Sequence, residues 1–400
     1  MTEGVTPPIP LEDAQARLLA MAAPLPVEDV PMAGAAGRYL AAPLVARRTQ
    51  PAADLSAMDG YALRGDGPWR VVGESRAGHP WAGALSTGES VRISTGAIMP
   101  DGADTVLIQE EAAREGDTLS LAGDAPAAGR HIRRAGMDFR EGDELLAAGT
   151  RIGPAAIALA LSGGHGAVQV RRRPRVTVID CGDELARDPV DCAPHQIPAS
   201  NGAMLAAMTS SLPCRVERVG PVADDLDSLA RALSAAAEAD LVVISGGASV
   251  GDHDLVRPAL EAIGAKIDFW RAAIKPGKPL MVARKGAQVV LGLPGNPVSA
   301  FVTGFLFMLP LLRALSGSGA PLPRTAMLPL AGDIGPGGPR REFLRARWNG
   351  EALVPIAQTD SAALHALAAA DALIDRPAHA KEAKAGTYVP ACLLENGSFA

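Results

Sequence analysis

The sequence predicts a multidomain α/β protein built around a mostly parallel sheet and extended by β-rich parts. Three observations lead to this prediction: a length of 400 residues, a hydrophobic fraction of 48% against 20% charged residues, and a central segment in which apolar strands alternate with helices. The length corresponds to two or three domains, and the composition is typical of a chain with a packed core.

The N-terminal part is expected to be a helical framework that holds an inserted β module. Residues 10–22 have the apolar spacing of a short amphipathic helix. From about 47 to 145, short alternating runs are separated by Gly and Asp, which indicates short strands and turns. Helical spacing returns at 154–164, where Pro154 suits a first helical turn. Because helices flank the β module, it is expected to be an insertion.

The segment from 175 to about 315 predicts a parallel sheet covered on both faces. The apolar runs "RVTVIDC", "CRVERVG", "DLVVIS" and "QVVLGL" each lead toward a helical segment, and strands that alternate with helices form parallel sheets buried on both sides. After residue 320 the chain returns to short strands and prolines, so a small C-terminal β domain is expected.

Charge, cysteine usage and hydropathy argue against several classes of protein. The net charge is −6 and the one basic run is "RRRPR" (171–175), so nucleic acid is not an expected partner. The N-terminus lacks the pattern of a signal peptide, and the longest apolar run, 300–312, is short for a bilayer span and contains Pro310. The four cysteines form no CxxC pair, which favours a reduced, cytoplasmic protein without structural zinc.

Four segments are expected to meet at one rim of the sheet. In open parallel sheets, ligands bind beyond the carboxyl ends of the strands. The segments 181–185, 245–254 and 293–297 each follow a predicted strand, and 222–225 follows another. Their convergence is stronger evidence for a ligand site than any one motif.

Two of these segments resemble anion-binding turns. In "LPGNP", Gly295 allows close backbone approach, Asn296 can cap, and Pro297 fits the first helical position. The helix start then offers amides and a positive dipole to an anion. "SGGASVG" (245–251) has the pattern of a backbone phosphate nest. An ordinary structural turn is the alternative for each motif taken alone.

Lysines and acids near the rim predict binding of anions with help from a metal. Of six lysines, four lie between 266 and 285, and two of them, Lys275 and Lys278, flank a turn in "IKPGKP". An ammonium group is a compact partner for an oxyanion; the alternative is a solvated turn. Carboxylates beside a phosphate favour a bound Mg²⁺ between them. For each of these acids taken singly, helix capping or exposure to solvent is the alternative role. The acids in question are Glu184, Asp225, Asp252 and Asp254.

These residues belong to ordered motifs that carry a family resemblance. The motifs are "SAMDGYAL" (56–63), "ISTGAIMPDGADTV" (93–106), "RRAGMDF" (133–139), "GDEL" (182–185), "GGASVGDHD" (246–254), "IKPGKP" (274–279) and "GLPGNPVSA" (292–300). Their order resembles that of the MoeA-type molybdopterin molybdenumtransferases, the family that includes the E domain of gephyrin.

The resemblance implies an elongated homodimer with four parts per chain. They are a helical linking region (1–46 and 140–170), an inserted β-rich domain (47–139), a three-layer α/β domain that binds molybdopterin (171–319), and a C-terminal β-barrel (320–400). It also implies insertion of molybdate into adenylylated molybdopterin, with release of AMP and with Mg²⁺. The site would be shared, with the inserted domain of one subunit reaching the α/β domain of the other. A transient contact with the molybdopterin adenylyltransferase is a further implied partner.

The motifs place the site residues in three groups. Catalytic roles fall on Asp59, Thr95, Asp138, Glu184, Asp225, Lys275 and Lys278. Cofactor binding falls on Gly246, Gly247, Ser249, Gly251, Pro294, Gly295, Asn296 and Pro297. Metal binding falls on Glu184, Asp252 and Asp254.

The sequence departs from the family pattern at three places. Asp180 and Cys181 stand where the family usually has Ser-Thr, Ala199-Ser200 stands in place of Asp-Ser, and Arg271 replaces a lysine. Cys181 has no histidine placed to activate it, so it is expected to be a buried strand-end thiol rather than a nucleophile. A non-catalytic binding or scaffold protein of the same fold, and a molybdopterin adenylyltransferase, are the competing functional hypotheses.

Overall fold

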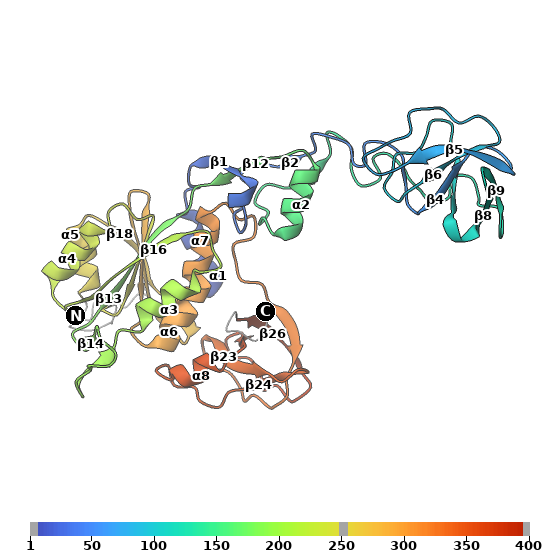
Figure 1. Ribbon diagram of the computed structural model, residues 1–400. Helices are drawn as coiled ribbons and strands as arrows, with labels where there is room; N and C mark the ends of the chain where they lie inside the picture. Colours follow the sequence, from blue (N-terminus) through green and yellow to red (C-terminus); the bar gives the residue numbers. More distant parts are fainter. Residues whose placement is uncertain (1–6, 248–254, 395–400) are drawn as a thin grey trace.

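The protein is elongated, with a central α/β part from which an arm carries a separate β-rich unit (Figure 1). This computed structural model describes residues 7–247 and 255–394. The C-terminal β part lies against the central part, whereas the inserted unit lies at the far end of the arm (Figure 1).

The arm is built from two short antiparallel ribbons and one helix. β1 (Val27–Pro31) pairs with β12 (Ala167–Arg171), and β2 (Leu44–Val45) pairs with β11 (Glu144–Leu146). Helix α2 (Pro154–Ser162) starts with its proline at the first turn, as the sequence predicted. The expected helical linking region is therefore a mixed structure, because chain segments about 100 residues apart or more pair here as strands.

The inserted unit contains a six-stranded sheet, in the order β7-β4-β6-β5-β9-β8. Its short strands agree with the strands and turns that the sequence indicated from about 47 to 145. A further ribbon joins β3 (Leu55–Ser56) to β10 (Ile132–Arg133) and closes the unit. The strands of the sheet are β4 (Gly60–Leu63), β5 (Trp69–Ser75), β6 (Glu89–Ile93), β7 (Thr105–Ile108), β8 (Ala112–Glu115) and β9 (Thr118–Leu121).

The central sheet has six strands in the order β16-β13-β17-β21-β20-β18. The four strands expected from the apolar runs are parallel neighbours. Two strands that the sequence analysis missed complete the sheet, and both pairs formed by β20 are antiparallel. The six strands are β13 (Arg175–Cys181), β16 (Arg215–Val222), β17 (Leu241–Ser245), β18 (Lys266–Arg271), β20 (Pro279–Lys285) and β21 (Gln288–Leu293).

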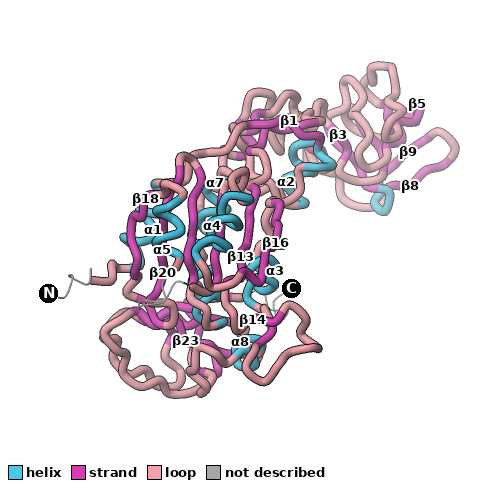
Figure 2. Tube along the Cα trace, turned by 90° about the vertical axis from the view of Figure 1, so that its left-hand side faces the viewer, coloured by secondary structure: helices cyan, strands magenta, loops and turns pink. Residues whose placement is uncertain are grey.

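Helices cover both faces of this sheet (Figure 2). Along β17, Leu241 and Val243 join the core cluster on one face, whereas Val242 and Ile244 join the cluster on the other. This alternation follows from the two-residue repeat of a strand, and burial on both faces requires a continuous apolar run. One face holds α1 (Leu11–Ala20), α3 (Asn201–Met208), α6 (Pro297–Thr303) and α7 (Leu309–Leu315), and the other holds α4 (Leu226–Ala235) and α5 (Val256–Ala262).

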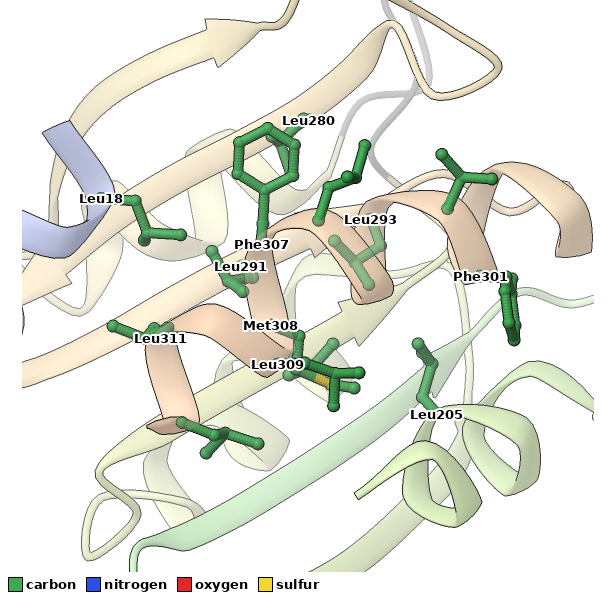
Figure 3. Close-up of a cluster of buried hydrophobic side chains, with 14 of the residues drawn as sticks. Leu18, Leu205, Leu280, Leu291, Leu293, Phe301, Phe307, Met308, Leu309 and Leu311 are labelled. Carbon is green, nitrogen blue, oxygen red and sulfur yellow. The ribbon is translucent and has the colours of Figure 1, made fainter. Parts of the chain in front are cut away.

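The larger core is organised around one apolar helix (Figure 3). A π-helical segment, Gly304–Met308, joins α6 to α7, so that a single helix runs from Pro297 to Leu315. By length and composition it could cross a membrane, but 89% of its apolar window is buried inside the protein. The helix extends beyond the apolar run 300–312 at both ends, and Pro310 lies inside it, shortly after the π-helical segment.

The C-terminal part forms a sheet in the order β19-β23-β25-β26-β22, with β24 (Leu353–Pro355) paired to β23. A single bridge, Leu330 to Leu353, also joins the chain after β22 to β24. β19 comes from the central part, so main-chain pairing binds the two parts together. The remaining elements are β19 (Ile274–Lys275), β22 (Ala326–Pro329), β23 (Arg341–Trp348), β25 (Ala372–Arg376), β26 (Tyr388–Leu393) and α8 (Leu364–Ala368).

Candidate functional site

A cleft of about 720 Å³ lies at the carboxyl ends of the central parallel strands. Three of the four predicted segments contribute to its wall, from the ends of β13, β17 and β21. The start of α3 and two residues of the C-terminal part complete it. The lining residues from the predicted cofactor-binding set are Gly246, Gly247, Pro294, Gly295, Asn296 and Pro297.

The glycines at the end of β17 are required by close backbone contact. Gly246 has φ +94°, and a Cβ added there would lie 2.0 Å from the carbonyl oxygen of Cys181. Gly247 also has a positive φ, of +65°. Only glycine adopts such conformations without strain. The two residues therefore bring bare main chain to the cleft, as expected for a ligand that is gripped by backbone groups.

An asparagine ties three elements together at the base of the cleft. The side-chain amide of Asn201, the first residue of α3, donates to Ser245 Oγ at 3.0 Å and to Gly295 O at 2.7 Å. It thereby connects α3 to the end of β17 and to the turn before α6. No local sequence pattern shows these contacts, because they span 44 and 94 residues.

A loop of the C-terminal part reaches the start of α6. Ser361 O accepts a hydrogen bond from Val298 N at 2.9 Å, and Ser361 Oγ accepts one from Asn296 Nδ2 at 2.9 Å. Pro297 has no amide hydrogen. The helix start therefore offers fewer donors to an anion than expected, because the amide of Val298 already donates to Ser361 and Pro297 has no amide hydrogen.

Asp180 is a buried carboxylate in the cleft wall. It is 4% exposed, and its Oδ1 accepts a hydrogen bond from Gly202 N, in the first turn of α3, at 2.8 Å. Arg218 lies 3.8 Å from its other oxygen. Burial raises the pKa of Asp180, while the bond from Gly202 and the charge of Arg218 oppose this rise. Asp180 therefore supplies a buried hydrogen-bond acceptor to a main-chain amide at the N-terminus of α3.

Cys181 is a buried strand-end thiol, as the sequence predicted. Its Sγ donates to Asp224 Oδ1 at 3.4 Å, and burial together with the charge of Asp224 raises its pKa to about 12. The thiol is therefore protonated at neutral pH, and a protonated thiol is a poor nucleophile.

The fourth predicted segment lies beside the cleft instead of lining it. Asp224 contacts the neighbouring segment through a hydrogen bond from Asp183 N to its Oδ2, at 3.3 Å. Asp225 is exposed and caps α4: its Oδ1 accepts from Ser228 N at 2.7 Å. The hydrogen bonds from Ser228 lower the pKa of Asp225. The structure thus gives Asp225 the capping role that was weighed against a catalytic one.

The two predicted lysines lie outside the cleft lining. Lys275 Nζ forms an ion pair with Glu342 Oε1 at 3.0 Å, and the glutamate side chain is only 9% exposed. Lys278 is exposed and directly precedes Pro279, which lines the cleft. In this conformation Lys275 therefore holds the C-terminal part in place.

The predicted metal set is only partly described. Glu184 is exposed and lines the cleft. Its carboxylate is the hard oxygen donor that Mg²⁺ prefers. Within residues 7–247 and 255–394, no group of three or more His, Cys, Asp or Glu side chains is arranged to hold a metal ion. Four predicted residues, Ser249, Gly251, Asp252 and Asp254, lie outside the described part of the chain.

The predicted residues of the inserted unit form a separate exposed group. Asp59 Oδ1 accepts a hydrogen bond from Thr95 N at 2.7 Å, and Asp138 is exposed on the same unit. Among the described residues, the cleft lining includes none from 47–139. The inserted unit lies at the far end of the arm, away from the central sheet whose strand ends line the cleft (Figure 1), so one chain does not bring the two groups together.

The fold and the cleft define a class: multidomain α/β proteins that present glycine turns to a small ligand at the ends of parallel strands. Three family models match the chain in order. They are the MoeA N-terminal region, domains I and II, at 9–164; a probable molybdopterin binding domain at 177–314; and the MoeA C-terminal region, domain IV, at 327–394. This chain belongs to the MoeA family of molybdopterin molybdenumtransferases.

Relatives with this name cover most of the chain. The molybdopterin molybdenumtransferase of a Nostoc strain is 38% identical over 304 residues, which are 72% of this chain and 70% of the relative. That of Staphylococcus aureus is 31% identical over 405 residues, 97% of this chain and 96% of the relative. A crystal structure of the molybdopterin biosynthesis MoeA protein from Pyrococcus horikoshii OT3 has a TM-score of 0.84 at 27% identity, covering 97% of this chain and 100% of that one.

Proposed function

We propose that this transferase inserts molybdenum, supplied as molybdate, into adenylylated molybdopterin and releases AMP, which completes molybdenum cofactor biosynthesis. The observation that carries the proposal is the cleft at the strand ends. Its volume of about 720 Å³ lies in the range of small-molecule sites, and its wall combines bare glycine backbone with both polar and apolar side chains.

The chemistry requires the cleft to hold a pyrophosphate while one of its bonds breaks. Main-chain amides fixed in advance stabilise negative charge as it develops, because they need no reorganisation. The turns at 246–247 and 294–297 bring such backbone to the cleft. Leu185, Ile197 and Leu364 add apolar wall and limit the access of water. Since Cys181 is protonated, no covalent enzyme intermediate is proposed.

Mg²⁺ is the proposed resident cation. Glu184 would supply one carboxylate oxygen from the cleft wall, together with Asp252 and Asp254 from the adjoining segment. When bound, the ion would reduce the negative charge of the phosphates. The donor type of Glu184 supports this assignment.

We also propose a homodimer in which each site is shared. Asp59, Thr95 and Asp138 of one subunit would complete the cleft of the other. Two features support this: the three residues are exposed on the inserted unit, which lies at the far end of the arm (Figure 1), and the same unit carries exposed apolar side chains. These side chains are Met58 (39% exposed), Ile98 (43%) and Met137 (62%).

A mixed dimer tests the shared site. Asp59→Ala and Glu184→Ala should each abolish AMP release in the homodimer. In a mixed dimer isolated through two different tags, one of the two shared sites is intact, so activity should return to about half of the wild-type value. If each chain used its own Asp59 and Glu184, both sites would be broken and the mixed dimer would stay inactive.

The AMP-release assay also separates the competing functions. Purified protein, adenylylated molybdopterin, molybdate and Mg²⁺ should yield AMP above a blank reaction, and no release would leave the scaffold function as the better account. ATP-dependent adenylylation of molybdopterin would instead indicate the adenylyltransferase.

We also propose the domain boundaries, the C-terminal barrel, the cellular location and a protein partner. The linking region would comprise 1–46 and 140–170, with 47–139 inserted, followed by 171–319 and 320–400. The bridge from Leu330 to Leu353 supports a C-terminal barrel. A cytoplasmic location is supported by four free cysteines. A transient contact with the adenylyltransferase would deliver the adenylylated substrate directly.

A further inference from the structure

The turn before α6 depends on one side chain for its peptide orientation. The carbonyl of Gly295 accepts a hydrogen bond from Asn201 Nδ2 at 2.7 Å. The second hydrogen of the same amide is donated to Ser245 Oγ at 3.0 Å. A backbone carbonyl only accepts hydrogen bonds, so the nitrogen of the Asn201 amide, and not its oxygen, must face Gly295. Both donors of this side chain are thereby used to hold the main chain.

The orientation of this carbonyl fixes the following amide. In a trans peptide unit the C=O of Gly295 and the N–H of Asn296 point in opposite directions. Since Asn201 holds the carbonyl, the N–H of Asn296 must point away from Asn201. Among the described residues, Asn296 N has no hydrogen-bond acceptor, although the turn lines the cleft. An unpaired amide in such a place is a ready donor to an anion.

Two neighbouring positions at this helix start offer no free donor. Val298 N donates to Ser361 O at 2.9 Å, and Pro297 has no amide hydrogen. The amide of Asn296 is therefore a donor that this turn offers to a ligand oxygen, and its direction depends on Asn201.

We propose that Asn201 is a positioning residue for the reaction: it sets the Gly295–Asn296 peptide so that the Asn296 amide donates to a phosphate oxygen of the substrate. The inference rests on the proposed function, because it assumes a phosphate-bearing ligand in the cleft. Asn201 acts on the ligand indirectly, through the orientation of the Gly295–Asn296 peptide. The hydrogen bond to Ser245 Oγ holds the side chain of Asn201 in place.

The substitution Asn201→Asp tests the inference with little change in size. It replaces the donor that faces Gly295 O by a carboxylate oxygen, so two acceptors meet and the peptide must reorient. Ser245→Ala removes only the anchor and should have a smaller effect in the same direction. Asn349→Asp is the matched control, because Asn349 is exposed and its Oδ1 accepts from Glu351 N and Ala352 N, two bonds that aspartate keeps.

The sequence permits a direct spectroscopic readout. The chain has four asparagines, and only Asn296 follows a glycine. Labelling with ¹³C-carbonyl glycine and ¹⁵N-asparagine therefore selects the Asn296 amide alone. Pyrophosphate is the probe, added to the full-length protein, and calorimetry measures its Kd in parallel.

We expect the Asn296 signal of the wild type and of Asn349→Asp to shift with pyrophosphate until saturation. In Asn201→Asp the signal should be displaced before any addition, and the Kd should rise about tenfold, as expected for the loss of a hydrogen bond to a charged group. Wild-type shift and Kd in Asn201→Asp would overturn the inference, and so would a wild-type signal that pyrophosphate leaves unmoved. Absence of AMP release, by contrast, would refute the proposed function itself.

Discussion

The close contact at the end of β17 gives a quantitative prediction for Gly246→Ala. At Gly246 the backbone has φ +94°, and an added Cβ would lie 2.0 Å from Cys181 O. Gly264, in the turn after α5, provides the matched comparison, since it has φ +75° with no atom within 4 Å of an added Cβ. Both substitutions incur the left-handed strain of about 1–2 kcal/mol, but only the first creates a clash.

The clash sets the difference between the two variants. The carbonyl of Cys181 must recede by about 1.5 Å before an added methyl group reaches ordinary contact, and it belongs to β13, an inner strand of the sheet. Overpacking of this kind costs about 1–3 kcal/mol. Gly246→Ala should therefore destabilise the protein by about 2–5 kcal/mol, against about 1–2 kcal/mol for Gly264→Ala.

Hydrogen–deuterium exchange followed by mass spectrometry measures this difference locally, which suits a chain of several domains. Peptides that cover β13 should exchange about fivefold to hundredfold faster in Gly246→Ala than in Gly264→Ala, the ratio that corresponds to 1–3 kcal/mol. Pyrophosphate binding should be lost only in Gly246→Ala. Equal exchange in the two variants would falsify the steric argument.

Three further predictions concern ionisable groups near the cleft. Because burial raises the pKa of Asp180, ionisation of this carboxyl group opposes folding above its unfolded-state pKa. Asp180→Asn keeps an acceptor for Gly202 N and should therefore be more stable than the wild type at pH 7. Urea denaturation should show that this difference in the free energy of unfolding disappears below about pH 4. A gap independent of pH would contradict this. The pKa of about 12 for Cys181 predicts slow alkylation by iodoacetamide at pH 8, as followed by peptide mapping, with fast alkylation only after unfolding; fast labelling of the native protein would argue against the buried thiol. A double-mutant cycle with Lys275→Gln and Glu342→Gln should give a coupling of about 0.5–1 kcal/mol, since the lysine is half exposed, and zero coupling would mean that the pair does not form in solution.

The local rules of helix and strand formation were readable along the chain. The apolar runs of the central segment became β13, β16, β17 and β21, and Pro154 began α2. The missed strands β18 and β20 have a physical reason: no helix separates β18 from β20 or β20 from β21, so the alternation of strand and helix gave no signal for these antiparallel pairs.

Some residues of the candidate site could be predicted from the sequence, and others could not. Gly246, Gly295 and Asn296 could be found from the sequence because a strand followed by a glycine turn places backbone at the edge of a sheet. Glu184 reached the cleft for the same reason. Ser361 had no such signal, because its contact with the start of α6 depends on how the C-terminal part packs against the central one.

The amino-acid pattern alone determined the four parallel strands of the central sheet, their carboxyl rim and the glycines that approach it, because short-range periodicity and backbone stereochemistry decide those features. Only the tertiary structure decided which polar groups were already satisfied. Lys275 pairs with Glu342, Asp225 caps α4, and Ser361 takes the amide of Val298. A hydrogen-bonding group is free or occupied according to neighbours that lie far away in the chain.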